Sequence, residues 1–247
     1  MIWIIIGCLV LIIIAFIIYD NIRIQFTIYE EKTSFSLTVC QISDLHSKKI
    51  NIKKLLRMID KINPDCIFYT GDMVDGINDD LNISLNLIKS LMKYKSFYVL
   101  GNHELRLEDK LDEYLSNLRQ LGVVILRNEI INYKGALIKG EEPILKGDYS
   151  HIDDRYSDII LAHNPEWLLK YNGAYIFSGH THGGQFRLFG KGLYAPDQGI
   201  LPKYSKGYYE NKNKKMFISA GLGGKDFKLR LFNPPHINVV RFVNKST

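Results

Sequence analysis

Five of the seven histidines in this chain fall in short polar clusters, and each cluster follows a predicted apolar strand. In order, the clusters are Asp44-Leu45-His46, Gly71-Asp72, Gly101-Asn102-His103-Glu104, and a last group of His163 with the run Gly179-His180-Thr181-His182-Gly183-Gly184-Gln185. Asp, His and Asn are side chains that coordinate borderline divalent metals. Each cluster follows a different buried strand, so the clusters can form one site only in a fold where the ends of these strands meet. The number and type of side chains indicate a site for two metal ions.

The apolar runs alternate with amphipathic stretches along the first half of the chain. Short apolar runs predict strands over 35–42, 66–70, 97–100, 123–126, 136–138, 159–162 and 175–177. Apolar residues at three- and four-residue spacing predict helices over 52–62, 81–92 and 105–121. Near the C-terminus helical periodicity disappears, and 216–219 and 237–243 are expected to be antiparallel strands. The pattern predicts an α/β fold, with a loop over 140–156.

Length and composition fit one globular domain. The chain has 247 residues, of which 46% are hydrophobic and 23% charged, so general disorder is excluded. The net charge is +6, and much of the excess lies late, in Lys203, Lys206, Lys212, Lys214 and Lys215. This basic region is either a solvated face or a patch that meets anionic headgroups beside a membrane. Basic residues do not interleave with aromatic ones as in nucleic-acid-binding proteins, so no nucleic acid is expected as a partner.

Residues 2–19 form an unbroken apolar run of about the length that crosses a hydrocarbon core as a helix. A buried core helix would carry polar residues at helical spacing, and a cleaved signal peptide would begin with basic residues; the run has neither feature. We therefore expect a single-pass membrane anchor over 1–19, a connector over 20–33 and a catalytic domain over 34–247. Arg23 and Lys32 follow the anchor, which favours the cytoplasmic side for the domain by the positive-inside rule.

The first three clusters offer oxygen and nitrogen ligands, although each has a simpler interpretation alone. Asp44 and His46 alternate beyond a strand, so both can face one site; an Asp there is otherwise a helix cap. Asp72 sits in what could be a plain turn, but its two carboxylate oxygens can bridge two cations. Asn102 offers a carbonyl oxygen, and His103 could serve as an acid or a charge stabiliser; the alternative is a turn followed by a surface histidine.

The cluster around His180 and His182 is the most specific of the four. Two imidazoles at alternate positions, bounded by glycines after an apolar run, can reach a pair of metals from one side. A lone histidine is usually a satisfied core residue, and His163 alone would be unremarkable. Because the clusters occur together, each supplies ligands after a separate strand.

With these residues placed, the chain resembles the calcineurin-like metallophosphoesterases. Within them it is similar to the membrane-associated bacterial group of YkuE-, YaeI- and LpxG-type phosphodiesterases. The resemblance runs from about residue 34 to 243 and rests on D-x-H, G-D, G-N-H-E, His and G-H-T-H-G-G-Q in that order. It implies a four-layer α/β sandwich of two mixed β-sheets flanked by helices.

The resemblance also implies a ligand set. One metal would be held by Asp44, His46 and His182. The second would be held by Asn102, His163 and His180, with Asp72 bridging both. A hydroxide shared by the metals would attack phosphorus in line, and His103 would assist the leaving oxygen. Nitrogen and oxygen ligands without thiolate fit two ions of Mn, Fe or Zn. Glu104 stands where many relatives carry Asp, and it would orient a neighbouring group.

The expected substrate carries a phosphodiester, pyrophosphate or phosphomonoester, in a headgroup that is lipid-linked or nucleotide-linked. The segments 140–158 and 189–209 are expected to shape the choice of substrate. Two other functions remain open at this stage. An amidohydrolase-type binuclear enzyme would begin with H-x-H and commonly add a bridging lysine, neither of which is seen. A catalytically silent membrane scaffold would have lost ligands, whereas every expected position is filled.

Overall fold

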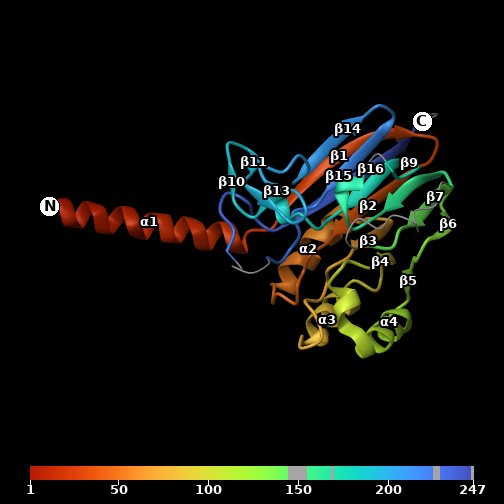
Figure 1. Cartoon of the computed structure of the whole chain (residues 1–247), viewed down its shortest axis with the longest axis horizontal. Coiled ribbons are helices and arrows are strands. Elements are labelled where there is room, and N and C mark those ends of the chain that lie inside the picture. Colours follow the sequence, from red (N-terminus) through yellow and green to blue (C-terminus); the bar gives the residue numbers. More distant parts are fainter. Residues whose placement is uncertain (144–154, 168–169, 225–228, 246–247) are drawn as a thin grey trace.

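The computed structural model describes residues 1–143, 155–167, 170–224 and 229–245. One long helix, α1 (Ile2–Ile22), projects from a body built around two β-sheets (Figure 1). The remaining helices are α2 (Ile52–Ile62), α3 (Leu81–Ser90), α4 (Leu111–Gln120), and the short 3₁₀ helices η1 (Glu104–Lys110), η2 (Pro165–Trp167) and η3 (His182–Gly184).

The first sheet has six strands, in the spatial order β1-β16-β2-β3-β4-β5. They are β1 (Gln25–Thr33), β16 (His236–Asn244), β2 (Leu37–Ile42), β3 (Cys66–Thr70), β4 (Lys95–Val99) and β5 (Val123–Ile125). Strands β2 to β5 are parallel; β16 runs antiparallel to β2 and parallel to β1. The sheet is therefore mixed, and its parallel strands all end on the same side.

The second sheet also has six strands, in the order β14-β15-β9-β8-β7-β6. They are β14 (Gly207–Asn211), β15 (Lys214–Ile218), β9 (Gly173–Ser178), β8 (Ser157–Leu161), β7 (Ala136–Gly140) and β6 (Glu129–Tyr133). The four central strands are parallel, and the two edge strands are antiparallel to their neighbours. Two small hairpins complete the body: β10 (Arg187–Leu188) with β11 (Lys191–Gly192), and β12 (Tyr194–Ala195) with β13 (Gly199–Ile200).

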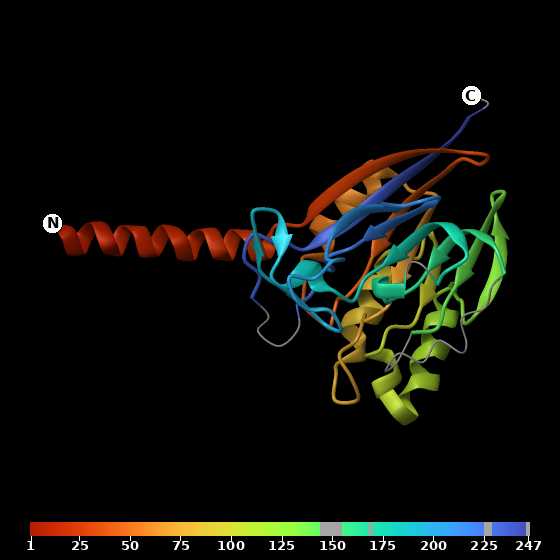
Figure 2. The ribbon, with the colours of Figure 1, turned by 45° about the horizontal axis from the view of Figure 1, so that its top comes forward.

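The two sheets pack face to face through an apolar core (Figure 2). Phe68 of β3 lies at its centre, with its ring centroid 5.9 Å from that of Phe97 and 5.1 Å from that of Phe177. Since Phe177 comes from the second sheet, the edge-on contact between Phe68 and Phe177 joins the two layers. Strands buried on both faces need apolar side chains on both, which explains why β3 reads as a continuous apolar run.

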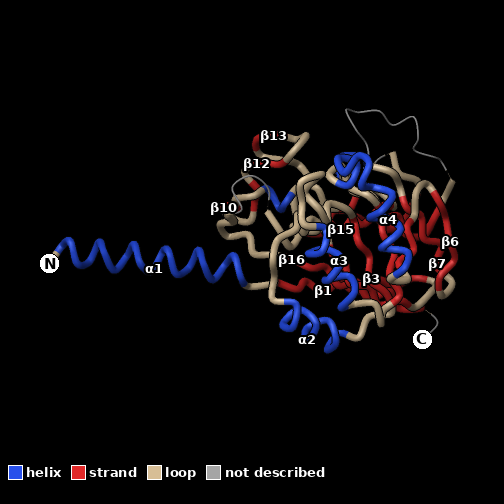
Figure 3. Tube along the Cα trace, turned by 90° about the horizontal axis from the view of Figure 1, so that it is seen from below, coloured by secondary structure: helices blue, strands red, loops and turns tan. Residues whose placement is uncertain are grey.

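Helices α2, α3 and α4 cover the other face of the first sheet (Figure 3). Helix α2 begins where the side chain of Asn51 accepts a hydrogen bond from the backbone of Lys54, and it ends at Asn63 with a φ of 48°, one residue before Pro64. On the outer face of the second sheet, a smaller core forms around Ile160, Tyr171 and Met216. The prediction of two mixed sheets flanked by helices is confirmed.

Three local predictions from the sequence differ from the structure. The expected connector contains β1, which pairs with β16 along its whole length. The expected helix over 105–121 is divided into η1 and α4, because Glu108 has a φ of 52° and interrupts helical hydrogen bonding. Edge strands β6 and β14 were not predicted, since their side chains are only half-buried or exposed and neither strand forms a long apolar run. Of the loop expected over 140–156, residues 144–154 lie outside the described part of the chain.

Helix α1 is the one described helix that is long and apolar enough to cross a membrane, and none of its apolar window is buried in the body. A signal sequence passes the same test. Its last turns contact the body: Asp20 is buried and accepts a hydrogen bond from the backbone of Asn233 at 3.0 Å. The helix is therefore held at its C-terminal end by the domain.

Replacing Phe68 by Ala should lower the free energy of unfolding by about 3–5 kcal/mol, because it removes a buried ring between the sheets and leaves a cavity. Urea denaturation of the full chain in detergent, followed by circular dichroism, measures the change. Leu137→Ala on β7, where the side chain is partly exposed, is the matched control and should cost less than about 1 kcal/mol. An equal loss in both variants would contradict the assigned core.

Candidate metal centre

The polar clusters converge at the carboxyl ends of five parallel strands. Asp44 and His46 follow β2, Asp72 follows β3, and Asn102 with His103 follows β4. His163 follows β8, and His180 with His182 follows β9. The first three strands belong to one sheet and the last two to the other, so packing of the sheets brings the clusters together. The structure places all the residues expected at the site in this one region.

Three groups of His, Asp and Glu side chains could each hold a metal ion. They are Asp44 with His46 and His182, Asp72 with His163 and His180, and His46 with Asp75 and His103. The first two groups contain six of the seven expected metal ligands. The third shares His46 with the first and contains the expected acid, His103.

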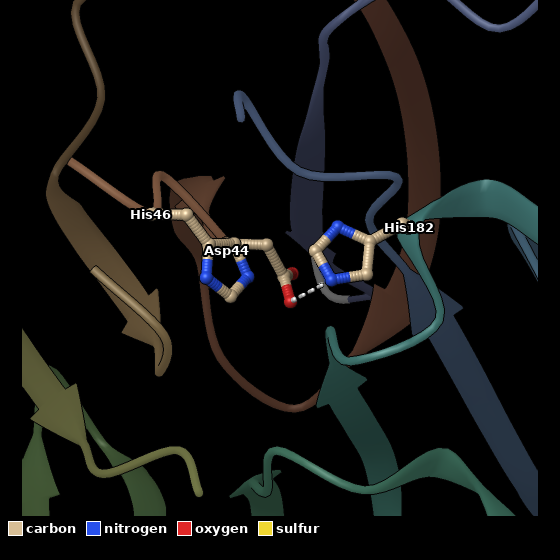
Figure 4. Close-up of side chains that lie close together, drawn as sticks. All are labelled: Asp44, His46 and His182. Atoms are coloured by element: carbon tan, nitrogen blue, oxygen red, sulfur yellow. Dashed lines mark ion pairs between the residues drawn. The ribbon is translucent and has the colours of Figure 1, made fainter. Parts of the chain in front are cut away.

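The first group joins β2 to the loop after β9 (Figure 4). Nε2 of His182 lies 3.9 Å from Oδ1 of Asp44, and the rings of His46 and His182 lie 4.8 Å apart. All three side chains are buried. The backbone N–H of His180 donates to Oδ1 of Asp44 at 2.9 Å, so the carboxylate also fixes the position of the loop that carries both later histidines.

The second group surrounds Asp72. Nε2 of His163 lies 3.1 Å from Oδ2 of Asp72 and 3.2 Å from Nδ1 of His180. The same Oδ2 lies 3.6 Å from Nε2 of His46, which belongs to the first group. Asp72 is thus the carboxylate that lies between the two groups.

Several buried polar atoms at the site have no hydrogen-bond partner within the described residues. They are Oδ2 of Asp44, Nε2 of His46, Oδ1 of Asn102, Nε2 of His103 and Nδ1 of His182. A buried polar atom without a partner costs free energy, so such atoms are rare unless a ligand satisfies them. Oxygen and imidazole nitrogen atoms are ligands that divalent transition metals prefer. The side chains present at the site therefore fit a divalent transition metal.

In three of the histidines expected to bind metal, one ring nitrogen contacts an oxygen atom of the protein. Nδ1 of His46 lies 3.0 Å from Asp75, and Nδ1 of His163 lies 2.8 Å from the carbonyl oxygen of Thr70. Nε2 of His180 lies 2.8 Å from Asp197. Histidines that bind metals commonly donate their other N–H in this way, which fixes the tautomer and the ring orientation.

The sequence analysis missed Asp75 and Asp197. Asp75 contacts His46, and it also contacts Nδ1 of His103 through its backbone oxygen at 2.9 Å and its carboxylate at 3.0 Å. Its position three residues after Asp72 was a usable signal. Asp197 lies in the turn between β12 and β13, far from any strand end that was predicted, and nothing in its local sequence indicates a contact with His180.

Glu104 joins the loops that carry Asp72 and Asn102. One carboxylate oxygen accepts from the backbone N–H groups of Asp72 at 2.8 Å and Gly101 at 2.7 Å. The other accepts from the N–H of Met73 and the hydroxyl of Tyr98, both at 2.7 Å. The loops also need glycine, because a Cβ on Gly71 would lie 2.5 Å from the backbone nitrogen of Gly101.

The backbone is strained at the ligand positions. Asp44, His46, Asp72, His180 and His182 all have a φ between 45° and 71°, in the left-handed region that side chains other than Gly seldom adopt. Such strain persists only where surrounding contacts enforce it, and it is concentrated at functional sites. Here the enforcing contacts are the hydrogen bonds of Asp44 and Glu104 to the loops.

Burial and neighbouring charges shift the pKa values of the site's side chains in different directions. Burial would raise the pKa of Asp72, but His163, His46 and His103 outweigh that effect and hold it well below its usual range. Burial disfavours the charged form of His163, yet Asp72 raises the pKa of His163 to about 10. Burial and the charges of His46 and Arg230 hold the pKa of His182 well below its usual value, so His182 is neutral and can offer a lone pair.

Glu104→Gln should weaken metal binding by about 10–100-fold, because an amide cannot accept all four hydrogen bonds that position the loops. Isothermal titration with Mn²⁺ measures the affinity. Glu113→Gln removes an exposed carboxylate from α4 and should leave the affinity unchanged. Unaltered Mn²⁺ affinity in folded Glu104→Gln would show that Glu104 does not support the site.

Comparison with known proteins gives a consistent family. The model of the calcineurin-like phosphoesterase family matches residues 37–184. The chain is 28% identical to the metallophosphoesterase YkuE of Bacillus subtilis over 85% of this chain and 79% of that protein. It is 32% identical to YpbG of the same organism, over 83% of this chain and 80% of that one.

Two proteins of lower sequence identity are also similar to this chain, one with a named activity and one with a solved structure. The chain is 24% identical to LpxG of Chlamydia muridarum, named a UDP-2,3-diacylglucosamine pyrophosphatase, over 83% of each protein. The crystal structure of TT1561 of Thermus thermophilus has a TM-score of 0.50, with 10% identity over 76% of this chain and 90% of that one. The latter likeness concerns the fold alone. With the family model spanning more than half of the sequence, the chain belongs to the calcineurin-like phosphoesterases and is a hydrolase of phosphoester bonds.

Proposed function

We propose that the chain is a membrane-anchored phosphoesterase that uses two divalent metal ions. Asp44, His46 and His182 would hold one ion, and Asn102, His163 and His180 the other, with Asp72 bridging both. The observation that carries this proposal is the set of buried, unpartnered ligand atoms on both sides of Asp72. Mn, Fe and Zn all suit these nitrogen and oxygen donors.

Bound metals would supply Lewis acidity, which activates water and neutralises charge on the phosphoryl oxygens. We assign His103 the role of proton donor to the leaving oxygen. Its Nδ1 is engaged by Asp75, whereas its Nε2 has no hydrogen-bond partner among the described residues and lies 4.0 Å from Asp72. Burial lowers the pKa of His103, and the charge of Asp72 opposes that shift.

We propose a phosphodiester, pyrophosphate or phosphomonoester within a lipid-linked or nucleotide-linked headgroup as the substrate. The name of the LpxG relative, which includes a diacylated sugar nucleotide, supports a lipid-linked pyrophosphate within this set. A panel of lipid-linked pyrophosphates, glycerophosphodiesters and nucleotides would rank the candidates by kcat/KM.

We further propose that α1 is a single-pass anchor and that the phosphoesterase domain faces the cytoplasm. Arg23 and Lys32 follow the apolar run. Positive charge near a membrane span is favoured on the cytoplasmic side.

Asp72→Ala should abolish hydrolysis of bis-p-nitrophenyl phosphate in the presence of Mn²⁺ and lower the bound metal, because the shared carboxylate is lost. Release of p-nitrophenol and elemental analysis of the full chain in detergent measure both effects. Asp112→Ala, on the exposed part of α4, should keep both values at the wild-type level. Wild-type turnover and metal content in Asp72→Ala would exclude the assigned bridge.

In the same assay, His103→Ala should lower kcat by about 10²–10⁴-fold, as expected for loss of a general acid, while the bound metal is retained. Parallel loss of metal would instead make His103 a ligand. Complete inactivity of the wild-type chain with Mn²⁺, Zn²⁺ and Fe²⁺ would argue against the proposed chemistry.

Protease added to intact cells should leave the phosphoesterase domain whole, and the same protease should digest it once the cells are opened. Immunoblotting against a C-terminal tag follows the domain. A tagged protein of known outward orientation, expressed in the same cells, confirms that the protease is active. Digestion of the domain in intact cells would place it on the opposite side of the membrane.

A further inference from the structure

Exposed apolar side chains gather where α1 meets the body. We call the apolar rim the set formed by Leu188, Phe189, Ile200, Leu201, Leu229 and Phe232. Phe189 is 95% exposed at the tip of the β10–β11 hairpin, and Ile200 is 82% exposed on β13. Large apolar residues clustered at loop tips are unusual on a soluble surface and indicate a surface that contacts a partner.

Part of the rim lies beside the end of α1, whereas β13 stands away from the helix in the view of Figure 3. Strands β10 and β13 lie at the end of the body from which α1 emerges (Figures 1 and 2). The backbone N–H of Arg187 in β10 donates to Leu231, which ties the first hairpin to the segment that carries Leu229 and Phe232. The part of the rim formed by β10 and by Leu229 and Phe232 is therefore continuous with the helix.

One contact shows how far the rim reaches along the helix. The ring of Phe232 lies 5.3 Å from that of Phe16 in α1. Phe16 precedes Tyr19, the last residue of the apolar run, by three residues, which corresponds to about 4.5 Å of helix. If α1 spans the bilayer, Phe232 lies at a depth where the surroundings are apolar.

Hydrogen bonds fix the rim relative to the helix. The side chain of Asn21 donates to the carbonyl oxygen of Arg230 and accepts from its N–H, both at 2.8 Å. The carboxylate of Asp20 accepts from the N–H of Asn233. These bonds bracket Phe232 in the sequence, so the segment cannot turn away from α1 without breaking buried polar contacts.

A basic pocket of about 450 Å³ adjoins the rim at Leu201. Arg187, Lys191, Lys203 and Lys206 line it, and no acidic residue does so among the described residues. Burial, followed by the charges of Arg187 and Arg230, lowers the pKa of Lys206 to about 7. Four cationic side chains and no acidic one line the pocket among the described residues, so the pocket would attract an anion.

We propose that the apolar rim inserts into the bilayer beside α1, and that the adjoining basic pocket contacts anionic lipid headgroups. Apolar tips with a basic flank match the two layers of an anionic membrane surface, apolar interior and charged headgroups. The inference rests on the proposed anchoring by α1 and adds a second membrane contact, which would hold the body against the surface.

Fluorescent labelling of single cysteines in the full chain, in lipid nanodiscs whose two faces are open to solvent, tests the depth of the rim. Cys40 and Cys66 are buried, so the native Cys8 in α1 can be labelled directly. Phe189→Cys and Leu137→Cys, each combined with Cys8→Ser, report on the rim and on the distant strand β7. Iodide quenches labels in water, and doxyl lipids quench labels in the bilayer.

In nanodiscs containing phosphatidylglycerol, the labels at positions 8 and 189 should be quenched by doxyl lipid, and the label at 137 by iodide. If iodide quenches the label at 189 as it does the label at 137, while doxyl lipid quenches the label at 8, the insertion of the rim would be excluded but not the anchoring by α1. Iodide quenching of the label at position 8 would exclude both the anchoring by α1 and the insertion of the rim. Protection at 189 in detergent that rises with protein concentration would identify a second copy of the chain as the occupant and overturn the proposal. Hydrolysis of bis-p-nitrophenyl phosphate tests the chemistry separately.

The basic pocket has its own test. Lys191→Gln and Lys203→Gln should each shift the ratio of inserted to exposed label at 189 about fivefold toward exposure in nanodiscs with phosphatidylglycerol, as about 1 kcal/mol per lysine near an anionic surface requires. Neither should have an effect in phosphatidylcholine alone. Lys89→Gln and Lys95→Gln, exposed and outside the pocket, are controls. An equal effect in both lipids would overturn headgroup contact by the pocket.

Discussion

The site depends on the buried carboxylate of Glu104. Three backbone N–H groups and one hydroxyl donate to it, and they come from the loop after β3, the start of the loop after β4, and β4 itself. A buried charge is costly unless it is well hydrogen-bonded, so the two loops are held in the one arrangement that satisfies it. That arrangement sets Asp72 in its left-handed conformation. His46, His103 and His163 lie around Asp72, so this contact sets the centre of the site, while Asp44 holds the loop that carries His180 and His182.

Hydrogen bonds also hold the histidine side chains in fixed orientations, as Glu104 holds the backbone of the loops. Contacts from Asp75, Thr70 and Asp197 fix the rings of His46, His163 and His180. In each ring, one nitrogen contacts an oxygen atom of the protein and the other nitrogen points into the site. These contacts come from the protein's own oxygen atoms, and such contacts orient the rings of histidines that bind metals.

The sequence was most informative where the chain has a strong local pattern. The expected strand over 66–70 and helix over 52–62 match β3 and α2, because a doubly buried strand and an amphipathic helix each carry a clear apolar period. Asp44, Asp72 and the clustered histidines could be found because they directly follow such strands. Strand β1 could not be found in this way, since its partner β16 lies at the opposite end of the sequence. The contact of Asp197 with His180 depends likewise on how a turn folds over the site, which no local pattern encodes.

The end of α1 and the metal centre share one structural support. Asn233 donates its backbone N–H to Asp20 and its side-chain amide to the carbonyl oxygen of His182, at 3.0 and 2.7 Å. Arg230, next to Asn21, donates to the carbonyl oxygens of Ala220 and Gly223, and the N–H of Gly223 donates in turn to the carbonyl oxygen of Asp44 at 2.7 Å. The segment that carries these residues therefore contacts the helix on one side and ligand loops on the other. A flexible tether would let the site sample all orientations, whereas this arrangement fixes its orientation relative to α1. With α1 in a membrane, the site would meet phosphate groups at a set height and angle, which favours headgroups that extend from the bilayer.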